Sequence, residues 1–160
     1  MPEQAAPQPA PQNPATRAVP RLVIAFDYGR RRIGAACGDT VSRTAAPLAT
    51  VPAAAGEPRW DVIDSLMREW QPAMVVVGLP YNVDGSDGSM TSEARNFAIE
   101  LERRHRKQVV LVDERYSSQE AEGRLKAARE SGLRRRRVAK ADVDATAACV
   151  ILERWFTEYT

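Results

Sequence analysis

The chain has 160 residues, enough for one domain with a sizeable core, and its 44% apolar and 28% charged residues and net charge of +2 are typical of a folded globular protein. Two cysteines are too few for a disulfide framework, and a single histidine disfavours a zinc site, so a metal ion here would be held by oxygen ligands. No apolar run could span a bilayer and the N-terminus lacks the apolar region of a secretory signal, so we expect a cytoplasmic protein with no membrane partner.

The first twenty residues differ in composition from the rest of the chain. Residues 1–20 hold six of the eleven prolines, with alanine and glutamine between them and no apolar periodicity. Such a segment cannot bury enough surface to offset the entropy lost on ordering. The sequence therefore predicts a disordered tail, followed by one domain over residues 21–160.

The first half of this domain is predicted to contain three strands, a helix and a further strand. The apolar run at 22–26 is typical of a central strand, a second strand is expected at 32–38, and a short third strand near 46–50. Apolar residues recur at helical spacing over 59–70, and the apolar run at 74–80 predicts another buried strand.

The second half alternates helices with one more strand. Residues 81–89 are rich in glycine and aspartate and predict a loop. Helices are expected at 91–105, 117–130 and 141–156, and a buried strand at 108–114. The alternation predicts an α/β domain with a mixed central sheet and helices on both faces, which is the order of elements of a ribonuclease-H-like domain.

Three acids stand out by position. Asp27 ends the first strand and Glu114 ends the last one, and sites in open α/β sheets form beyond the carboxyl ends of strands. Asp144 shares a stripe of the final helix with apolar residues, whereas Asp142 points roughly 200° away from it. A carboxylate on a packed face is costly unless it is paired, and a metal ion is one such partner.

Each acid also has a structural explanation. Asp27 fits a turn, Glu114 could pair with a nearby arginine, and Asp144 could favour the helix N-terminus. Taken together, the three acids favour a site for divalent metal with Asp27, Glu114 and Asp144 as ligands. Mg²⁺ or Mn²⁺ suits such ligands, and two ions about 4 Å apart can catalyse phosphodiester cleavage.

Basic residues near these acids are candidates for substrate contact. Residues 103–140 contain thirteen lysines and arginines but only five acids, which suits nucleic acid as well as a solvated surface. Arg30 follows Asp27, Arg95 lies near the start of a helix, and Lys140 precedes Asp144 by four residues. Each could contact a phosphate, and each could equally be solvated.

The chain resembles the YqgF/RuvX family, which is related to the RuvC Holliday-junction resolvases and is described as nucleases of pre-16S rRNA. The resemblance extends from Leu22 to Phe156 and is carried by the stretches AFDYGRRRIGAACG, EWQPAMVVVGLPYNVDG, TSEARNFA, VDERYSSQEA and KADVDATAACVILERWF. It implies a ribonuclease-H-like fold and a metal-dependent endonuclease with Asp27, Glu114 and Asp144 as metal ligands. It also makes Arg115 part of the site's surroundings.

Several functions remain open at this point. The resemblance implies processing of the 5′ end of pre-16S rRNA, with structured RNA and the ribosomal particle as partners. Alternatives are a resolvase that cuts four-way DNA junctions, and a non-catalytic RNA-binding or transcription-associated protein. The first stretch also resembles the phosphate loop of actin-like ATPases, but those proteins duplicate the domain. The sequence has no obvious dimer seam, so a monomer or a weak homodimer is expected.

Overall fold

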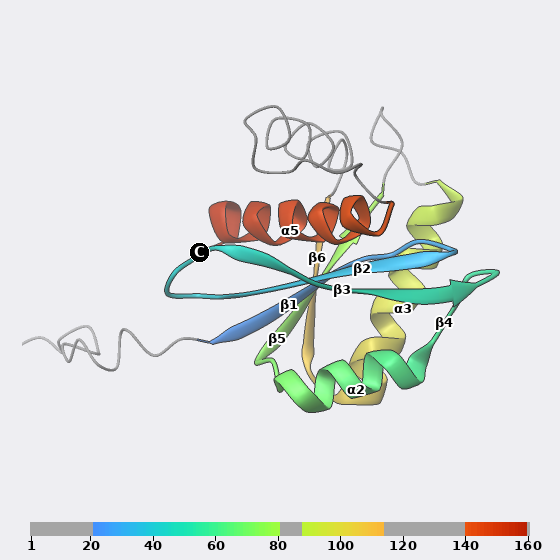
Figure 1. Cartoon of the computed structure of the whole chain (residues 1–160), viewed down its shortest axis with the longest axis horizontal. Helices are drawn as coiled ribbons and strands as arrows, with labels where there is room; N and C mark the ends of the chain where they lie inside the picture. Colours follow the sequence, from blue (N-terminus) through green and yellow to red (C-terminus); the bar gives the residue numbers. More distant parts are fainter. Residues whose placement is uncertain (1–20, 81–87, 114–139, 160) are drawn as a thin grey trace, which may run out of the picture.

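A mixed six-stranded sheet forms the middle layer of the molecule, in the order β4-β3-β2-β1-β5-β6 (Figure 1). The structure is a computed structural model that describes residues 21–80, 88–113 and 140–159. In chain order its elements are β1 (Leu22–Asp27), β2 (Arg32–Asp39), β3 (Ala45–Ala54), β4 (Glu57–Pro58), α2 (Trp60–Trp70), β5 (Met74–Leu79), α3 (Ser89–His105), β6 (Gln108–Asp113) and α5 (Lys140–Tyr159).

Strand β1 lies near the centre of the sheet because its side chains are apolar on both faces. It pairs antiparallel with β2 and parallel with β5, and β5 pairs parallel with β6. Four consecutive residues of β1, from Val23 to Phe26, are completely buried. Full burial of a valine, isoleucine or phenylalanine side chain stabilises a fold by about 1.5–3 kcal/mol, so this short strand is a large part of the core.

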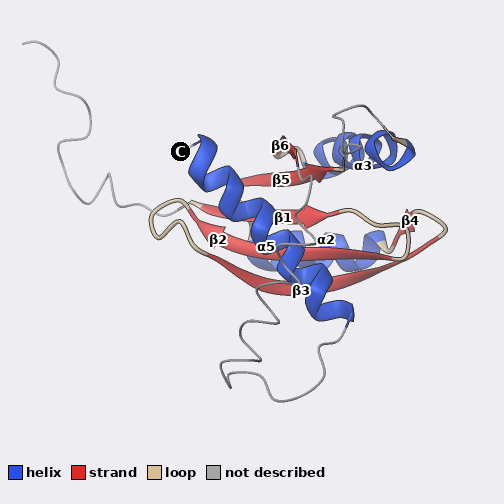
Figure 2. Cartoon of the chain, turned by 90° about the horizontal axis from the view of Figure 1, so that it is seen from above, coloured by secondary structure: helices blue, strands red, loops and turns tan. Residues whose placement is uncertain are grey.

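Helices cover both faces of the sheet (Figure 2). Ile24 and Phe26 point toward α2 and α3, and Phe26 meets Phe97 of α3 with the ring centroids 5.7 Å apart. Val23 and Ala25 point the other way, into a cluster with the side chains of α5. The alternation of a strand therefore sorts successive residues of β1 between the two helical layers.

Most predicted elements of the described residues are confirmed. The last strand, predicted to be buried, is an exception in its burial, because among Gln108–Asp113 only Val112 is buried. The helix predicted at 91–105 is α3, and it buries one face at Ala94, Phe97, Ala98 and Leu101. The third strand is longer than expected, because β3 pairs with almost the whole of β2 across one bulge. The two-residue strand β4 was not predicted. The tail, the 81–87 part of the predicted loop and the predicted helix at 117–130 lie outside the described residues. None of the helices described is both long and apolar enough to cross a bilayer.

Helices α2 and α3 are joined by a polar cluster around Asp64. Arg104 donates a hydrogen bond of 2.9 Å to Asp64 and lies 4.6 Å over the ring of Trp60, while Nε2 of His105 lies 2.8 Å from the other carboxylate oxygen. Arginines and a lysine flank His105 in the sequence, but its own side chain is only 16% exposed. Burial acts to raise the pKa of Asp64, but Arg104 and His105 outweigh it and hold that pKa below its ordinary value of 3.8.

Asp64→Asn is expected to destabilise the protein at neutral pH by about 1 kcal/mol, or roughly 3 °C in Tm. Because the folded pKa of Asp64 is lowered, its contribution is complete above the ordinary value of 3.8 and is lost as the pH falls through the folded pKa. Thermal unfolding from pH 7 to pH 3 should therefore show the wild type and the variant converging in acid.

Glu69→Gln, on the exposed side of α2, is the matched control and should change Tm little at any pH. A difference between wild type and Asp64→Asn that persists unchanged at pH 3 would show that the ionised Asp64 carboxylate does not stabilise this cluster.

Candidate active site

The carboxyl ends of three parallel strands meet at one edge of the sheet. Phe26 of β1 is in register with Val77 of β5, and Val77 is in register with Leu111 of β6. Asp27 and Asp113 are the last residues of their strands, and in the register of the sheet these two strand ends differ by about one residue. This is the edge of the sheet at which the sequence predicts a site.

Asp27 lies on the α5 side of this edge. Phe26 and Tyr28 belong to the core beneath α2 and α3, so the alternation of the strand directs the half-buried Asp27 to the opposite face. On the neighbouring strand, Asp27 is in register with Gly34. The face that holds Asp27 is the face on which α5 packs.

Helix α5 touches the sheet at Gly34. A Cβ atom built on Gly34 would lie 2.0 Å from the carbonyl oxygen of Asp144 and 3.1 Å from the backbone nitrogen of Ala145. Both neighbours are backbone atoms, which cannot turn aside as a side chain can. Only glycine permits this approach, so Gly34 sets the place of Asp144 relative to β2.

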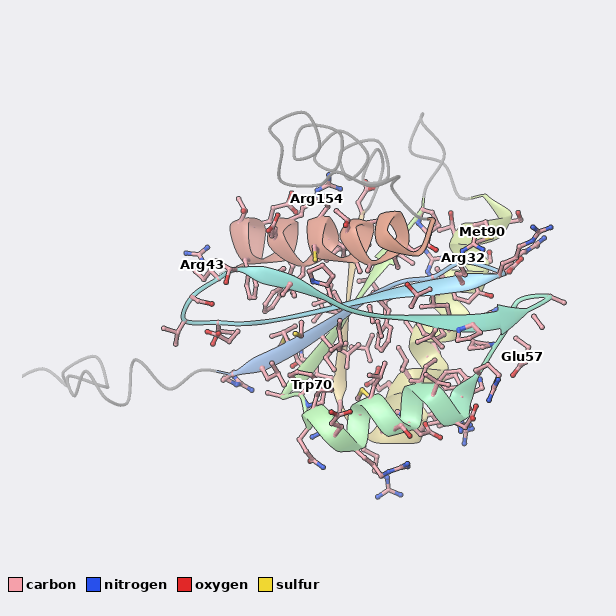
Figure 3. All side chains as sticks on the ribbon, in the orientation of Figure 1. Arg32, Arg43, Glu57, Trp70, Met90 and Arg154 are labelled. Carbon is pink, nitrogen blue, oxygen red and sulfur yellow. The ribbon has the colours of Figure 1, made fainter. Side chains whose placement is uncertain are left out.

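The side chain of Asp144 forms an ion pair with Arg32 of β2, close to this contact. Nε of Arg32 lies 2.8 Å from Oδ2 of Asp144, and the two side chains are 37% and 20% exposed. Figure 3 shows Arg32 at the end of the sheet where α5 begins. The cost of placing an acid on the packed stripe of α5, with Ala148, Ile151 and Trp155, is therefore offset by an arginine from β2.

The structure thus brings Asp27 and Asp144 to either side of Gly34, although they are far apart in the sequence. Half-buried carboxylates on one face are suitable ligands for a hard divalent ion. The ranges 21–80, 88–113 and 140–159 contain no group of three possible metal ligands. Glu114 and Arg115 lie outside these ranges, and Lys140 is the first residue of α5.

A side chain of α5 forms a hydrogen bond with the last residue of β6. Nη1 of Arg154 donates a hydrogen bond of 2.8 Å to the backbone carbonyl of Asp113, the residue before Glu114. Arg154 is ten residues after Asp144, or about 15 Å along the helix. One helix thus contacts both β2 and the carboxyl end of β6.

Arg30 lies over the other face of the sheet. It forms an ion pair with Glu93 of α3, and Tyr28 donates hydrogen bonds to Glu93, at 3.3 Å, and to the carbonyl oxygen of Gly56, at 2.8 Å. The hydrogen bond from Arg30 holds the pKa of Glu93 below its ordinary value. Burial, and then the charge of Glu93, raise the pKa of the Tyr28 phenol, which stays protonated and can donate.

This network borders a pocket of about 780 Å³ between the β3–β4 turn and helix α3. Its wall includes Trp60, which stacks on Phe97 with the ring centroids 5.5 Å apart. Several of its charged groups are paired with each other or with neighbours, as Arg30 is with Glu93 and Arg104 with Asp64. The pocket lies on the sheet face opposite Asp27 and Asp144, so it is not part of the acidic site.

The start of α3 is tied to the end of β5. The hydroxyl of Thr91, which is completely buried, donates to the carbonyl of Pro80 at 2.7 Å and accepts from the backbone N–H of Gly88 at 3.0 Å. Arg95 is one turn further along α3 and is half-buried. Glu93 and Arg95 differ by about 200° around the helix, so Arg95 does not face Arg30.

Sequence reasoning missed the contact at Gly34 and the partner of Asp144. A signal for the first was present, because alternate residues of β2 on the α5 side are small: Gly34, Ala36 and Gly38. A row of small residues on one face of a strand indicates that another backbone approaches closely. No local signal singled out Arg32 from its neighbours Arg30 and Arg31.

The chain is similar to known proteins over most of its length. The sequence profile of the RuvX family, described as a Holliday junction resolvase, matches residues 21–158. A protein of Edwardsiella ictaluri with the provisional name pre-16S rRNA nuclease is 46% identical over 86% of this chain and 95% of its own length. Proteins with the same provisional name are 46% identical in Proteus mirabilis, over 85% of this chain and 95% of their length, and 39% identical in Francisella tularensis, over 85% and 96%.

Among solved structures, RuvC of T. thermophilus in complex with a Holliday junction substrate matches with a TM-score of 0.52 and 15% identity, over 86% of this chain and 94% of RuvC. At this identity the likeness shows the fold alone, and it confirms the predicted ribonuclease-H-like class. The profile and the relatives cover nearly all of the domain that contains Asp27, Gly34 and Asp144. The chain belongs to the RuvX family.

Proposed function

We propose that this protein is a metal-dependent endonuclease that cuts structured RNA, with the 5′ end of pre-16S rRNA as its substrate. The observation that carries the proposal is the convergence of Asp27 and Asp144 on the two sides of Gly34, at the edge where the parallel strands end. Membership of a family of enzymes that act on nucleic acid supports it.

Asp27, Asp144 and Glu114 are the residues that would hold the metal. The first two are half-buried carboxylates on the α5 face. Glu114 directly follows β6 in the chain and is proposed from its position in the sequence. When bound, two Mg²⁺ or Mn²⁺ ions supply the Lewis acidity that activates water and stabilises a leaving oxygen.

The chain's own groups would position the nucleic acid. Arg95, Arg115 and Lys140 are proposed to contact phosphates, which orient a strand without reading its sequence. Arg30 is proposed for the same role, and a phosphate would then compete with Glu93 for its guanidinium. The close contact between Gly34 and the backbone of Asp144 would fix the start of α5.

The RNA substrate is proposed from the provisional names of the curated relatives. A nuclease of this kind would work in the cytoplasm and meet its RNA within a ribosomal particle. The second candidate is cleavage of four-way DNA junctions, which is favoured by the description of the family profile. Symmetric cutting of a junction needs two active sites and hence a dimer, whereas trimming one RNA end does not.

A cleavage assay with both substrates separates the candidates. Purified protein would be offered a pre-16S rRNA leader and a four-way DNA junction, each with Mg²⁺, Mn²⁺ or EDTA. Cleavage of the RNA that requires metal is the expected result. Symmetric cleavage of the junction by a dimeric protein would favour the resolvase. No cleavage of either substrate, alone or in a precursor ribosomal particle, would count against the proposed function.

A further inference from the structure

The ion pair between Arg32 and Asp144 places a positive charge directly on one proposed metal ligand. Nε of Arg32 lies 2.8 Å from Oδ2 of Asp144, and the pair joins residues 112 positions apart in the chain. A divalent ion on Asp144 would lie within a few ångströms of this guanidinium. Like charges this close repel each other, so metal and arginine compete for the carboxylate.

We propose that Arg32 is an internal counter-ion that couples metal binding to nucleic-acid binding. This inference rests on the proposed function. Arg32 neutralises Asp144 until a divalent ion takes its place, and the released guanidinium then pairs with a phosphate of the nucleic acid. Arginine suits both partners, because its planar group binds carboxylates and phosphates with the same donors.

The surroundings of Arg32 allow its side chain to change partners while its backbone stays in place. Arg32 is the first residue of β2, and its backbone is in register with Pro52 of β3. The preceding turn is tight, since a Cβ on Gly29 would lie 2.4 Å from the carbonyl oxygen of Arg32. The side chain itself is 37% exposed and pairs with Asp144 through Nε. Such a side chain can turn from Asp144 to solvent without disturbing the sheet.

Arg31 provides a matched control. It is the neighbouring arginine of the same turn and is exposed, so it carries the same charge close to the site. Its replacement tests the general effect of removing one positive charge, whereas Arg32→Gln also removes the partner of Asp144.

The first measurement is calorimetric titration of the full-length protein with MnCl₂ alone. Arg32→Gln should bind Mn²⁺ about five-fold more tightly than wild type, which corresponds to the upper end of the energy of a partly exposed ion pair. Arg31→Gln should stay within about two-fold of wild type, and Asp144→Asn should bind more weakly. Arg32→Lys, which keeps a charge near Asp144, should restore affinity toward that of wild type.

The second measurement is the affinity for a fluorescein-labelled phosphorothioate RNA hairpin, with Mn²⁺ and with EDTA. Coupling is reciprocal, so the gain in RNA affinity on adding Mn²⁺ measures it. This gain should be about five-fold larger in wild type than in Arg32→Gln. Thermal unfolding of each variant confirms that the proteins compared are folded.

The outcomes separate this inference from the proposed function. If wild type binds Mn²⁺ and Asp144→Asn does not, but Arg32→Gln binds no more tightly than wild type, the counter-ion role is overturned and the metal centre stands. An equal gain in RNA affinity in wild type and Arg32→Gln would overturn the coupling. If no variant binds Mn²⁺, the proposed metal centre fails and the inference fails with it.

Discussion

Asp27→Asn is expected to lower the rate of RNA cleavage about a thousandfold while the protein stays folded. The substitution keeps the shape of the side chain and removes the charge that would hold a metal ion at the end of β1. Loss of about 4 kcal/mol of charge stabilisation in the transition state corresponds to three orders of magnitude in rate. Single-turnover cleavage of the RNA leader with saturating Mg²⁺, together with the thermal unfolding midpoint, measures both quantities.

The matched control is Asp39→Asn. Asp39 is in register with Leu22, at the opposite end of β1 from Asp27 and so about 17 Å away along the strand. It accepts hydrogen bonds from the backbone of its own turn at Val41 and Ser42. We expect a small loss of stability and unchanged cleavage. Cleavage by Asp27→Asn at the wild-type rate would exclude Asp27 from the catalytic centre.

Gly34→Ala is expected to impair stability and activity together. The new methyl group would lie 2.0 Å from the carbonyl oxygen of Asp144, so α5 must move away from β2. Overpacking of this kind costs about 1–3 kcal/mol, seen as a lower denaturation midpoint. The shift also moves Asp144 relative to Asp27, and a displacement of about 1 Å in a catalytic group can cost a hundredfold in rate.

Gly38→Ala separates the two effects. Its methyl group would lie 2.2 Å from the carbonyl oxygen of Thr44, at the far end of β2 from Asp27, and would press on α5 at Leu152 and Phe156. It should therefore destabilise the protein to a similar degree but reduce cleavage much less at a temperature where both variants are folded. Equal loss of cleavage in the two variants would mean that activity depends on global stability rather than on the position of Asp144 against Gly34.

The sequence predicted those features that local patterning encodes. Continuous apolar runs identify β1 and β5, because strands buried on both faces have no polar alternation. The run at β6 also predicts the strand, although only Val112 of it is buried. Helical spacing identifies the buried stripe of α5 and places Asp144 on it. The position of Asp27 at the end of a central strand follows from the same reasoning.

The partners of charged side chains were not predicted. Arg30, Arg31 and Arg32 are equivalent in the sequence, yet Arg30 pairs with Glu93 on one face and Arg32 pairs with Asp144 on the other. Arg30 lies in the turn before β2, so the alternation of the strand does not place its side chain, and alternation does not say which helix covers each face. That choice depends on contacts between elements far apart in the chain.

The sequence by itself therefore determined the α/β class, the apolar stripe of α5 and the two acids that the structure brings together. Only the tertiary structure decided that these acids lie on either side of Gly34, that Arg32 neutralises one of them, and that Arg30 belongs to another network. The physical reason is that periodicity is a local property of the chain. The place at which α5 meets β2 is fixed instead by packing, through the absence of a Cβ atom at one residue.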